Sequence, residues 1–191
     1  EASRRLFVSR HFRVADVEKA EKLFAPLARA SLDEAFNTLQ PAMQDDINVH
    51  RFVFAYRTHG LANLLGKDYA YTILRQCVRF CCDHERNRIE RKGQPSAIRT
   101  VLPALLDQFK LVGKQPGSRD PGDSEVEKLA EVIYRGPAEK SAEAAAAALA
   151  DGLSPEVVGE AISIASNLLV LRQGPDQWRT LQLPARQDFQ R

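Results

Sequence analysis

The chain has 191 residues, of which 44% are hydrophobic and 27% charged, and its formal net charge is +2 at pH 7. This length and composition are typical of one globular domain with a core of its own. The basic residues are spread along the chain, so we expect no nucleic-acid partner, and no apolar run is long enough to span a membrane. The three cysteines lie close together without a disulfide pattern, which favours a cytoplasmic protein.

Helical periodicity starts near residue 14 and continues through the first half of the chain. Residues 14–39 predict two helices, and the second begins at the capping box Ser31-Leu32-Asp33-Glu34. We expect Pro41 to end that helix, because proline cannot donate the next backbone hydrogen bond. Further helices are expected at residues 46–60, 68–91 and 98–111.

Residues 113–123 contain two Pro-Gly pairs and predict a linker. The sequence thus predicts one helical domain, residues 1–191, with halves at 1–112 and 124–172. Residues 173–191 form a polar tail, and the abrupt ends of the chain indicate a fragment of a longer protein. In the second half, helices are expected at residues 124–134, 138–150 and 155–171, the last capped by Ser154 with Pro155 in its first turn.

Two parts of the chain echo each other at an offset of 88 residues. Residues 61–81 and 149–169 carry apolar side chains in matching positions, and each predicts a helix, a tight polar turn and a second helix. A duplicated hairpin predicts that the two copies pack face to face. We therefore expect an all-α fold, a helical bundle of about eight helices built from two related helical-hairpin units.

One candidate site lies on the helix predicted before the first of these turns. His50 and Arg57 are two helical turns apart and share a face, with Tyr56 beside Arg57. A histidine and an arginine near aromatic residues can bind an anion or act as an acid and base pair, so His50, Tyr56 and Arg57 are the candidate catalytic residues. The alternative is that His50 is a half-exposed surface residue.

A second candidate site is a metal centre. Cys77, Cys81 and His84 follow the i, i+4, i+7 spacing of one helix face, and thiolate and imidazole are ligands that zinc, copper and iron accept. With His50, they are the predicted metal ligands. The alternative is that Cys77 and Cys81 are small core residues, because buried free cysteine packs like an apolar side chain.

In the second half, Asn167 interrupts an apolar helix and Arg172 follows that helix. A polar side chain in such a helix needs a partner or faces solvent. These two residues are therefore candidates to line a seam between the halves, with a solvent-facing position as the alternative.

The segments Asp46–Leu61, Leu64–Gln76 and Leu153–Arg172 resemble an uncharacterised family of bacterial all-helical proteins. The shared pattern is a histidine before a Phe-rich helix, a hairpin with a Leu-Gly turn, and a second hairpin. Some members look fused to Rieske-type iron-sulfur domains, which implies redox or oxygen chemistry and places His50 in the site, with Tyr56 and Arg57 as weaker matches. Members usually continue past the last helix into a segment rich in His and Asp, whereas this chain has a polar tail there. If that segment completes the site, the resemblance implies that this chain is truncated or inactive.

The sequence therefore predicts a helical protein with a small-molecule or metal site in the seam between repeats, oxidoreductase-like in chemistry. In that function His50 is a metal ligand or an acid/base group, and Arg57 is an anion clamp. The alternative is a non-enzymatic helical scaffold, a protein-interaction module. The sequence indicates no particular cofactor, substrate or oligomeric state.

Overall fold

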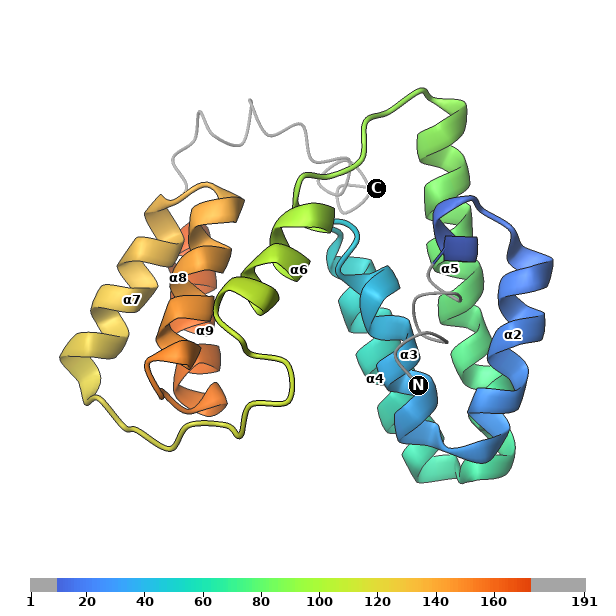
Figure 1. Ribbon diagram of the computed structural model, residues 1–191, viewed down its shortest axis with the longest axis horizontal. Helices are drawn as coiled ribbons and strands as arrows, with labels where there is room; N and C mark the ends of the chain where they lie inside the picture. The colour runs from blue at the N-terminus through green and yellow to red at the C-terminus, as the bar shows by residue number, and fades with distance from the viewer. Residues whose placement is uncertain (1–9, 173–191) are drawn as a thin grey trace. The chain divides into compact units, whose positions relative to one another are not determined.

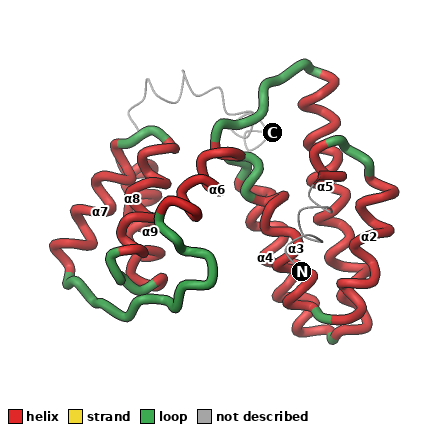
Figure 2. Tube along the Cα trace, viewed as in Figure 1, coloured by secondary structure: helices red, strands yellow, loops and turns green. Residues whose placement is uncertain are grey.

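The computed structural model describes residues 10–172, and this part of the chain is all-α, as predicted. Figures 1 and 2 show helices joined by loops, with no strand among the described residues. None of these helices is long and apolar enough to cross a membrane. The helices are α2 (Val17–Ala30), α3 (Leu32–Met43), α4 (Val49–Leu65), the 3₁₀ helix η1 (Lys67–Tyr69), α5 (Ala70–Glu90), α6 (Ile98–Gln108), α7 (Asp123–Arg135), α8 (Ala138–Ala150) and α9 (Pro155–Leu171).

The chain divides into two compact units, Glu1–Leu102 and Pro103–Arg191. The boundary lies within α6, before the 113–123 segment that the sequence predicted as a linker. Each unit has helices and buried apolar residues of its own. That the two units form a single domain with a site in the seam between them stays a prediction.

In the first unit, α5 is the central helix and contacts α2, α3 and α4 (Figure 1). Its apolar residues recur at helical spacing and are buried, so α5 contributes one continuous stripe to the core. The core residues at 2% exposure or less are Phe12, Ala20, Phe24, Ala28, Ala35, Leu39, Ala42, Ala55, Leu74, Val78, Cys81 and Cys82.

The helix ends follow local rules with two exceptions. The prediction of a helix at residues 46–60 placed its end too early, because α4 continues through Gly60 to Leu65. Ser31 caps α3, since its Oγ accepts a hydrogen bond of 3.3 Å from the backbone N–H of Glu34, as the capping box predicted. The prediction that Pro41 ends this helix was wrong, because α3 continues to Met43. A proline in the last turn removes one backbone donor only, and the burial of Ala42 and Met43 offsets that loss.

The second unit contains α7, α8 and α9, with α7 packed along α9 (Figure 1). Its small core consists of Val126, Ala130, Ala161 and Ala165. Ser154 caps α9 by accepting a hydrogen bond of 3.2 Å from the N–H of Val157, and Pro155 occupies the first turn, as predicted. Alanines at these contacts let the backbones of α7 and α9 approach closely.

The loop between α6 and α7 is attached to the second unit rather than running free. The N–H of Arg119 donates to the carbonyl of Gly152 at 3.0 Å, and the N–H of Ser154 donates to the carbonyl of Arg119 at 3.3 Å. The Arg119 side chain adds ion pairs to Glu125 at 2.8 Å and Asp151 at 2.6 Å. These contacts join the predicted linker to the turn between α8 and α9.

The two echoing segments share a helix–turn–helix outline. Cys77 and its counterpart Ala165 are both buried. Other matched positions differ, because Leu65 is half exposed whereas Leu153 is buried. The turns differ too, since the first contains η1 and the second the Ser154 cap. The internal duplication therefore stays a prediction.

The close approach of the loop to the α8–α9 turn predicts the effect of adding one methyl group. A Cβ at position 117 would lie 2.1 Å from the carbonyl oxygen of Gly152, so we expect Gly117→Ala to lower the free energy of unfolding by about 1–3 kcal/mol. Gly159→Ala is the matched control, because its Cβ meets no atom within 4 Å on α9 and should stabilise the helix by about 1 kcal/mol. Urea denaturation measures both changes, and equal effects would contradict the close contact.

Candidate functional site

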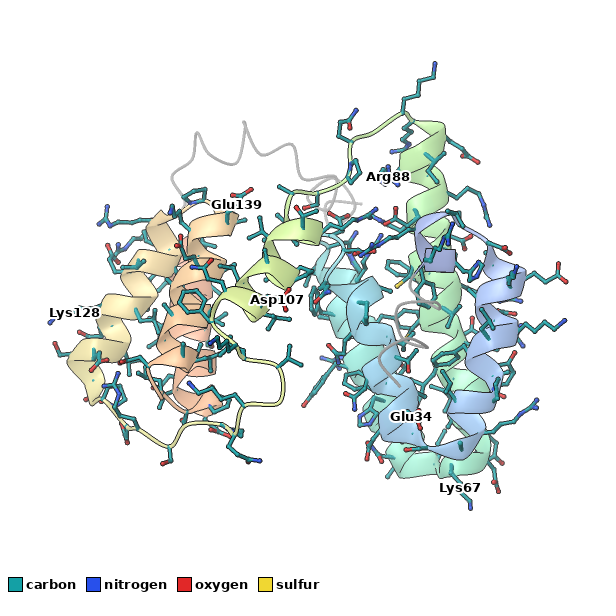
Figure 3. All side chains as sticks on the ribbon, in the orientation of Figure 1. Glu34, Lys67, Arg88, Asp107, Lys128 and Glu139 are labelled. Carbon is teal, nitrogen blue, oxygen red and sulfur yellow. The ribbon has the colours of Figure 1, made fainter. Side chains whose placement is uncertain are left out.

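The densest polar constellation of the first unit lies where the turn before α4, the later part of α5 and the start of α6 meet. Helix α5 carries Glu85 at the end of its buried stripe, and Arg88 follows one turn later (Figure 3). The turn before α4 supplies Asp45, which is 1% exposed. We call this constellation the buried ion cluster, and it consists of Arg13, Asp45, Arg51, Glu85, Arg88 and Arg99.

Glu85 is the centre of the cluster and is 1% exposed. Its Oε1 accepts hydrogen bonds from Arg51 Nη2 at 2.7 Å and Arg99 Nη2 at 2.5 Å. Its Oε2 accepts from Arg88 Nε at 2.9 Å. Burial alone would raise the pKa of Glu85, but the hydrogen bonds from Arg51 and Arg88 and the charge of Arg99 bring it below its ordinary value. Glu85 is therefore a buried carboxylate that stays ionised.

Asp45 is the second carboxylate of the cluster. Arg13 donates to it through two parallel hydrogen bonds of 2.8 Å, from Nε to Oδ2 and from Nη2 to Oδ1. The hydrogen bond to Asp45 raises the pKa of Arg13. Arg99 Nε lies 3.7 Å from Asp45 Oδ1, so Arg99 links the two carboxylates. Two parallel hydrogen bonds fix the orientation of the guanidinium relative to the carboxylate and also balance the two charges.

Arg51 is buried at 1% exposure in the first turn of α4. Its Nη1 donates to the carbonyl of Ala42 at 2.7 Å, which ties α4 to the end of α3. Its Nη2 contacts Glu85 and also lies 2.9 Å from His84 Nδ1. Arg51 Nε is buried without a hydrogen-bond partner. Arg51 thus joins three helices through one side chain.

His84 is half-buried beside the cluster, and each of its ring nitrogens faces a nitrogen of α4 or its cap. Arg51 Nη2 can only donate, so His84 Nδ1 accepts, and Nε2 lies 2.9 Å from Asn48 Nδ2. Asp46 Oδ2 is 3.5 Å from Nδ1. Burial and the charge of Arg51 lower the pKa of His84, although the carboxylates of Asp46 and Glu85 oppose this. Burial and the neighbouring guanidinium therefore favour the neutral ring of His84.

The structure places the three predicted catalytic residues, His50, Tyr56 and Arg57, on the exposed side of α4. The His50 ring centroid is 6.4 Å from that of Phe80, which is 6.3 Å from that of His84. Arg57 has no hydrogen bond or ion pair to any residue between 10 and 172. The structure thus brings His50 near His84 through a shared phenyl ring but does not bring Arg57 to a common cavity.

The predicted metal ligands Cys77 and Cys81 lie in the core. Burial raises the pKa of Cys77, whose Sγ is 3.0 Å from Thr58 Oγ1, and raises that of Cys81 to about 12. Both thiols are therefore neutral, whereas metals bind the thiolate. Among the residues that the structure describes, no group of three or more His, Cys, Asp or Glu could hold a metal. The metal site stays a prediction.

The two candidates of the second unit have surface positions. Asn167 is exposed on α9. The Arg172 guanidinium lies 5.1 Å from the centroid of the Tyr134 ring and 3.3 Å from Glu131 on α7. Both positions agree with the solvent-facing alternative within this unit.

Reasoning from the sequence missed Arg51, Asp45, Glu85 and Arg99. A signal was present, because Arg51 shares a helix face with the small residues Ala55, Thr58 and Ala62, all buried. Glu85 likewise extends the apolar stripe of α5 by one turn. A charged residue in line with an apolar stripe indicates a buried charge that needs a partner. Which of the chain's arginines supplies that partner depends on tertiary structure.

The opposite side of α4 is apolar and exposed. Tyr56 is 74% exposed and Leu64 is 81% exposed. The spacing of these side chains follows i, i+4, i+7, i+11, i+15 with Gly60 included, which is one helix face. We call this surface the α4 outer face, and it consists of Val49, Phe52, Val53, Tyr56, Gly60 and Leu64.

Comparison with known protein families, curated proteins and solved structures found no match. The resemblance to bacterial proteins fused to Rieske-type domains therefore stays a prediction.

Neutralising the central carboxylate of the cluster should be costly. We expect Glu85→Gln to lower the free energy of unfolding by about 3–5 kcal/mol, because it leaves Arg51 and Arg99 buried without their counter-charge. The exposed Glu90→Gln, on the same helix, should change it by no more than about 0.5 kcal/mol. Urea denaturation measures both variants. If Glu85→Gln lowers the free energy of unfolding by less than about 1 kcal/mol, the arginines of the cluster do not depend on the charge of Glu85.

The pKa shifts of His84 and Glu85 predict acid sensitivity. The folded pKa of His84 lies below its ordinary value of 6.5, so the unfolded chain takes up that proton first and stability falls as the pH drops below 6.5. The folded pKa of Glu85 lies below 4.5, so its contribution is present above 4.5 and is lost as the pH falls through the folded pKa. Urea denaturation from pH 7.5 to 4 should show decreasing stability, with a smaller slope above pH 5 in His84→Gln. An unchanged slope in that variant would contradict the assignment to His84.

Proposed function

We propose that this chain is a non-enzymatic protein-interaction module, and that a helix of a partner protein packs along the α4 outer face. One observation carries the proposal: the side of α4 with Arg51 and its small neighbours packs inside the first unit, and the opposite side is a row of exposed apolar residues. A contiguous row of exposed apolar residues typically marks an interaction site.

The shape of the surface suits a helix. The stripe runs from Val49 to Leu64, which is about 22 Å at the rise of an α-helix. Gly60 lies within the stripe, and a Cβ placed there would meet no atom within 4 Å. The small residue leaves room for a partner side chain between Tyr56 and Leu64. Helices that bind in this way insert anchors at i, i+3, i+4 and i+7.

The inner side of α4 is held rigidly, which favours binding. Asn48 caps the helix by accepting a hydrogen bond of 2.9 Å from the N–H of His50. Arg51 fixes the first turn to α3 and α5 through Ala42 and Glu85. A preformed surface loses less conformational entropy when a partner binds. The buried ion cluster thus supports the interaction surface from behind.

The other function predicted from the sequence, an oxidoreductase-like site for a small molecule or metal, stays a prediction. Its residues do not converge in the described part of the chain, since His50 and Arg57 are exposed whereas Cys77 and Cys81 are buried. The cytoplasmic location and the absence of a nucleic-acid partner also stay predictions. The exposed stripe favours the scaffold alternative instead.

A synthetic peptide tests the surface. The probe is an amphipathic helix of about five turns with leucine anchors and glutamine on both flanks. We expect the full chain to bind it and Val53→Asp to weaken binding at least about tenfold, because the carboxylate loses water in the interface. Val132→Asp is the matched control, since Val132 is similarly exposed on α7. Fluorescence anisotropy of labelled peptide gives the dissociation constants.

Circular dichroism shows whether both variants keep their helices. The proposal fails if the glutamine-flanked peptide does not bind, or if both substitutions weaken it equally. Equal weakening would mean that the peptide adheres to any exposed apolar residue.

A further inference from the structure

We infer that the partner helix carries carboxylates beside its apolar stripe, and that one of them pairs with Arg57. This inference rests on the proposed function, because it specifies the chemistry of the partner on the same surface. It follows from the charges on α4 and from the absence of a partner for Arg57 among residues 10–172. It also follows from the charge that a second copy of the chain would bring to the same surface.

Helix α4 has 17 residues and none of them is acidic. Its exposed Arg57 lies along one edge of the stripe, seven positions after His50. His59 is on the other side, where Asp33 of α3 lies 3.0 Å from it. The edge of the α4 outer face therefore presents one cation, Arg57, with no carboxylate on the same helix to balance it.

Arg57 differs from the arginines of the neighbouring helix α5. Arg75 and Arg79 both pair with Glu21, and Arg86 pairs with Asp83. Arg57 has no carboxylate, carbonyl or ring partner within residues 10–172. Asp33 of α3 already contacts His59. Asp83 of α5 already contacts Arg86. A carboxylate for Arg57 is therefore most easily supplied by the molecule that covers the stripe.

A second copy of this chain fits the surface poorly. The midpoint of the stripe between Val49 and Leu64 falls between Tyr56 and Arg57. A two-fold axis there would place Arg57 of one copy against Arg57 of the other, with no acidic residue on either α4 to balance them. Like charges at a contact disfavour that pairing. The same arrangement becomes favourable when the second helix carries Glu or Asp opposite Arg57.

The test compares two peptides that differ only in flank charge. Both have the leucine stripe of the neutral probe, and one carries glutamate while the other carries lysine on its flanks. We expect the full chain to bind the glutamate peptide at least about tenfold more tightly than the lysine peptide at low salt. This ratio should shrink in high salt, because exposed charges are screened. Isothermal titration calorimetry measures the two dissociation constants.

Substitution at position 57 assigns the preference to one side chain. Arg57→Glu should invert the ratio so that the lysine peptide binds more tightly. Lys22→Glu is the matched control, because Lys22 is an exposed cation of α2 and the substitution makes the same change in net charge. It should leave the ratio unchanged. An unchanged ratio in Arg57→Glu, or the same shift in Lys22→Glu, overturns the inference.

The outcomes also separate this inference from the proposed function. If the neutral peptide binds and the charged peptides bind equally, the interaction surface stands and the acidic partner is wrong. If sedimentation velocity shows a dimer that Val53→Asp dissociates, the partner is a second copy and the inference is wrong. A third outcome is that no peptide binds, that the chain binds vesicles containing phosphatidylserine, and that Arg57→Glu abolishes vesicle binding. In that case the surface is a membrane contact and both proposals fail.

Discussion

The pairing of Glu85 with Arg51 is the interaction on which the first unit depends most. Each side chain is 1% exposed, and the two residues are 34 positions apart in sequence. A buried ion pair of this kind contributes little net stability by itself, since desolvation offsets the attraction. Its effect is on geometry, because an ionised carboxylate in the core accepts only arrangements that bring guanidinium groups to it. The register of α4 against α5 follows from that requirement.

The same pairing gives α4 its two different sides. With Arg51 turned toward Glu85, the residues Ala55, Thr58 and Ala62 must face the core, and the stripe through Val53 must face away. Small residues on the inner side let α4 pack closely on α5. The larger apolar residues therefore lie on the outer side, which is unusual for a helix of a monomer and typical of an interface.

In the second unit, backbone hydrogen bonds between a loop and a turn hold the chain together. The fully buried residues of its core are alanine and valine, which bury little area each, and larger residues such as Leu129 and Ile133 are only partly buried against them. The loop before α7 compensates by pairing its backbone with the α8–α9 turn at Arg119, and Gly117 allows the two backbones to meet. A segment rich in proline and glycine thus acts as part of the unit, because its turns direct the backbone onto a neighbour.

Local patterns were enough to determine the helices. Apolar spacing, the Ser31 and Ser154 caps and the polar turns predicted an all-α chain, since these signals act within one or two turns. One exception is Pro41, where burial of the two following residues outweighed one missing donor. Another is Gly60, where the sequence predicted a helix end although α4 continues to Leu65. His50, Tyr56 and Arg57 lie on the exposed side of α4, and their catalytic role stays a prediction.

Tertiary structure alone decided which charges are buried. Arg51 and Arg57 are both arginines of one helix, and local spacing shows only that Arg51 shares a face with small residues. In the structure the first lies in the core and the second has no partner in the described residues. The difference comes from Glu85, which reaches Arg51 because α5 packs on that side of α4. The sequence by itself determined the helices and their apolar spacing, because periodicity and capping are local. It could not determine the pairing of charges, because attraction between side chains acts through space and not along the chain.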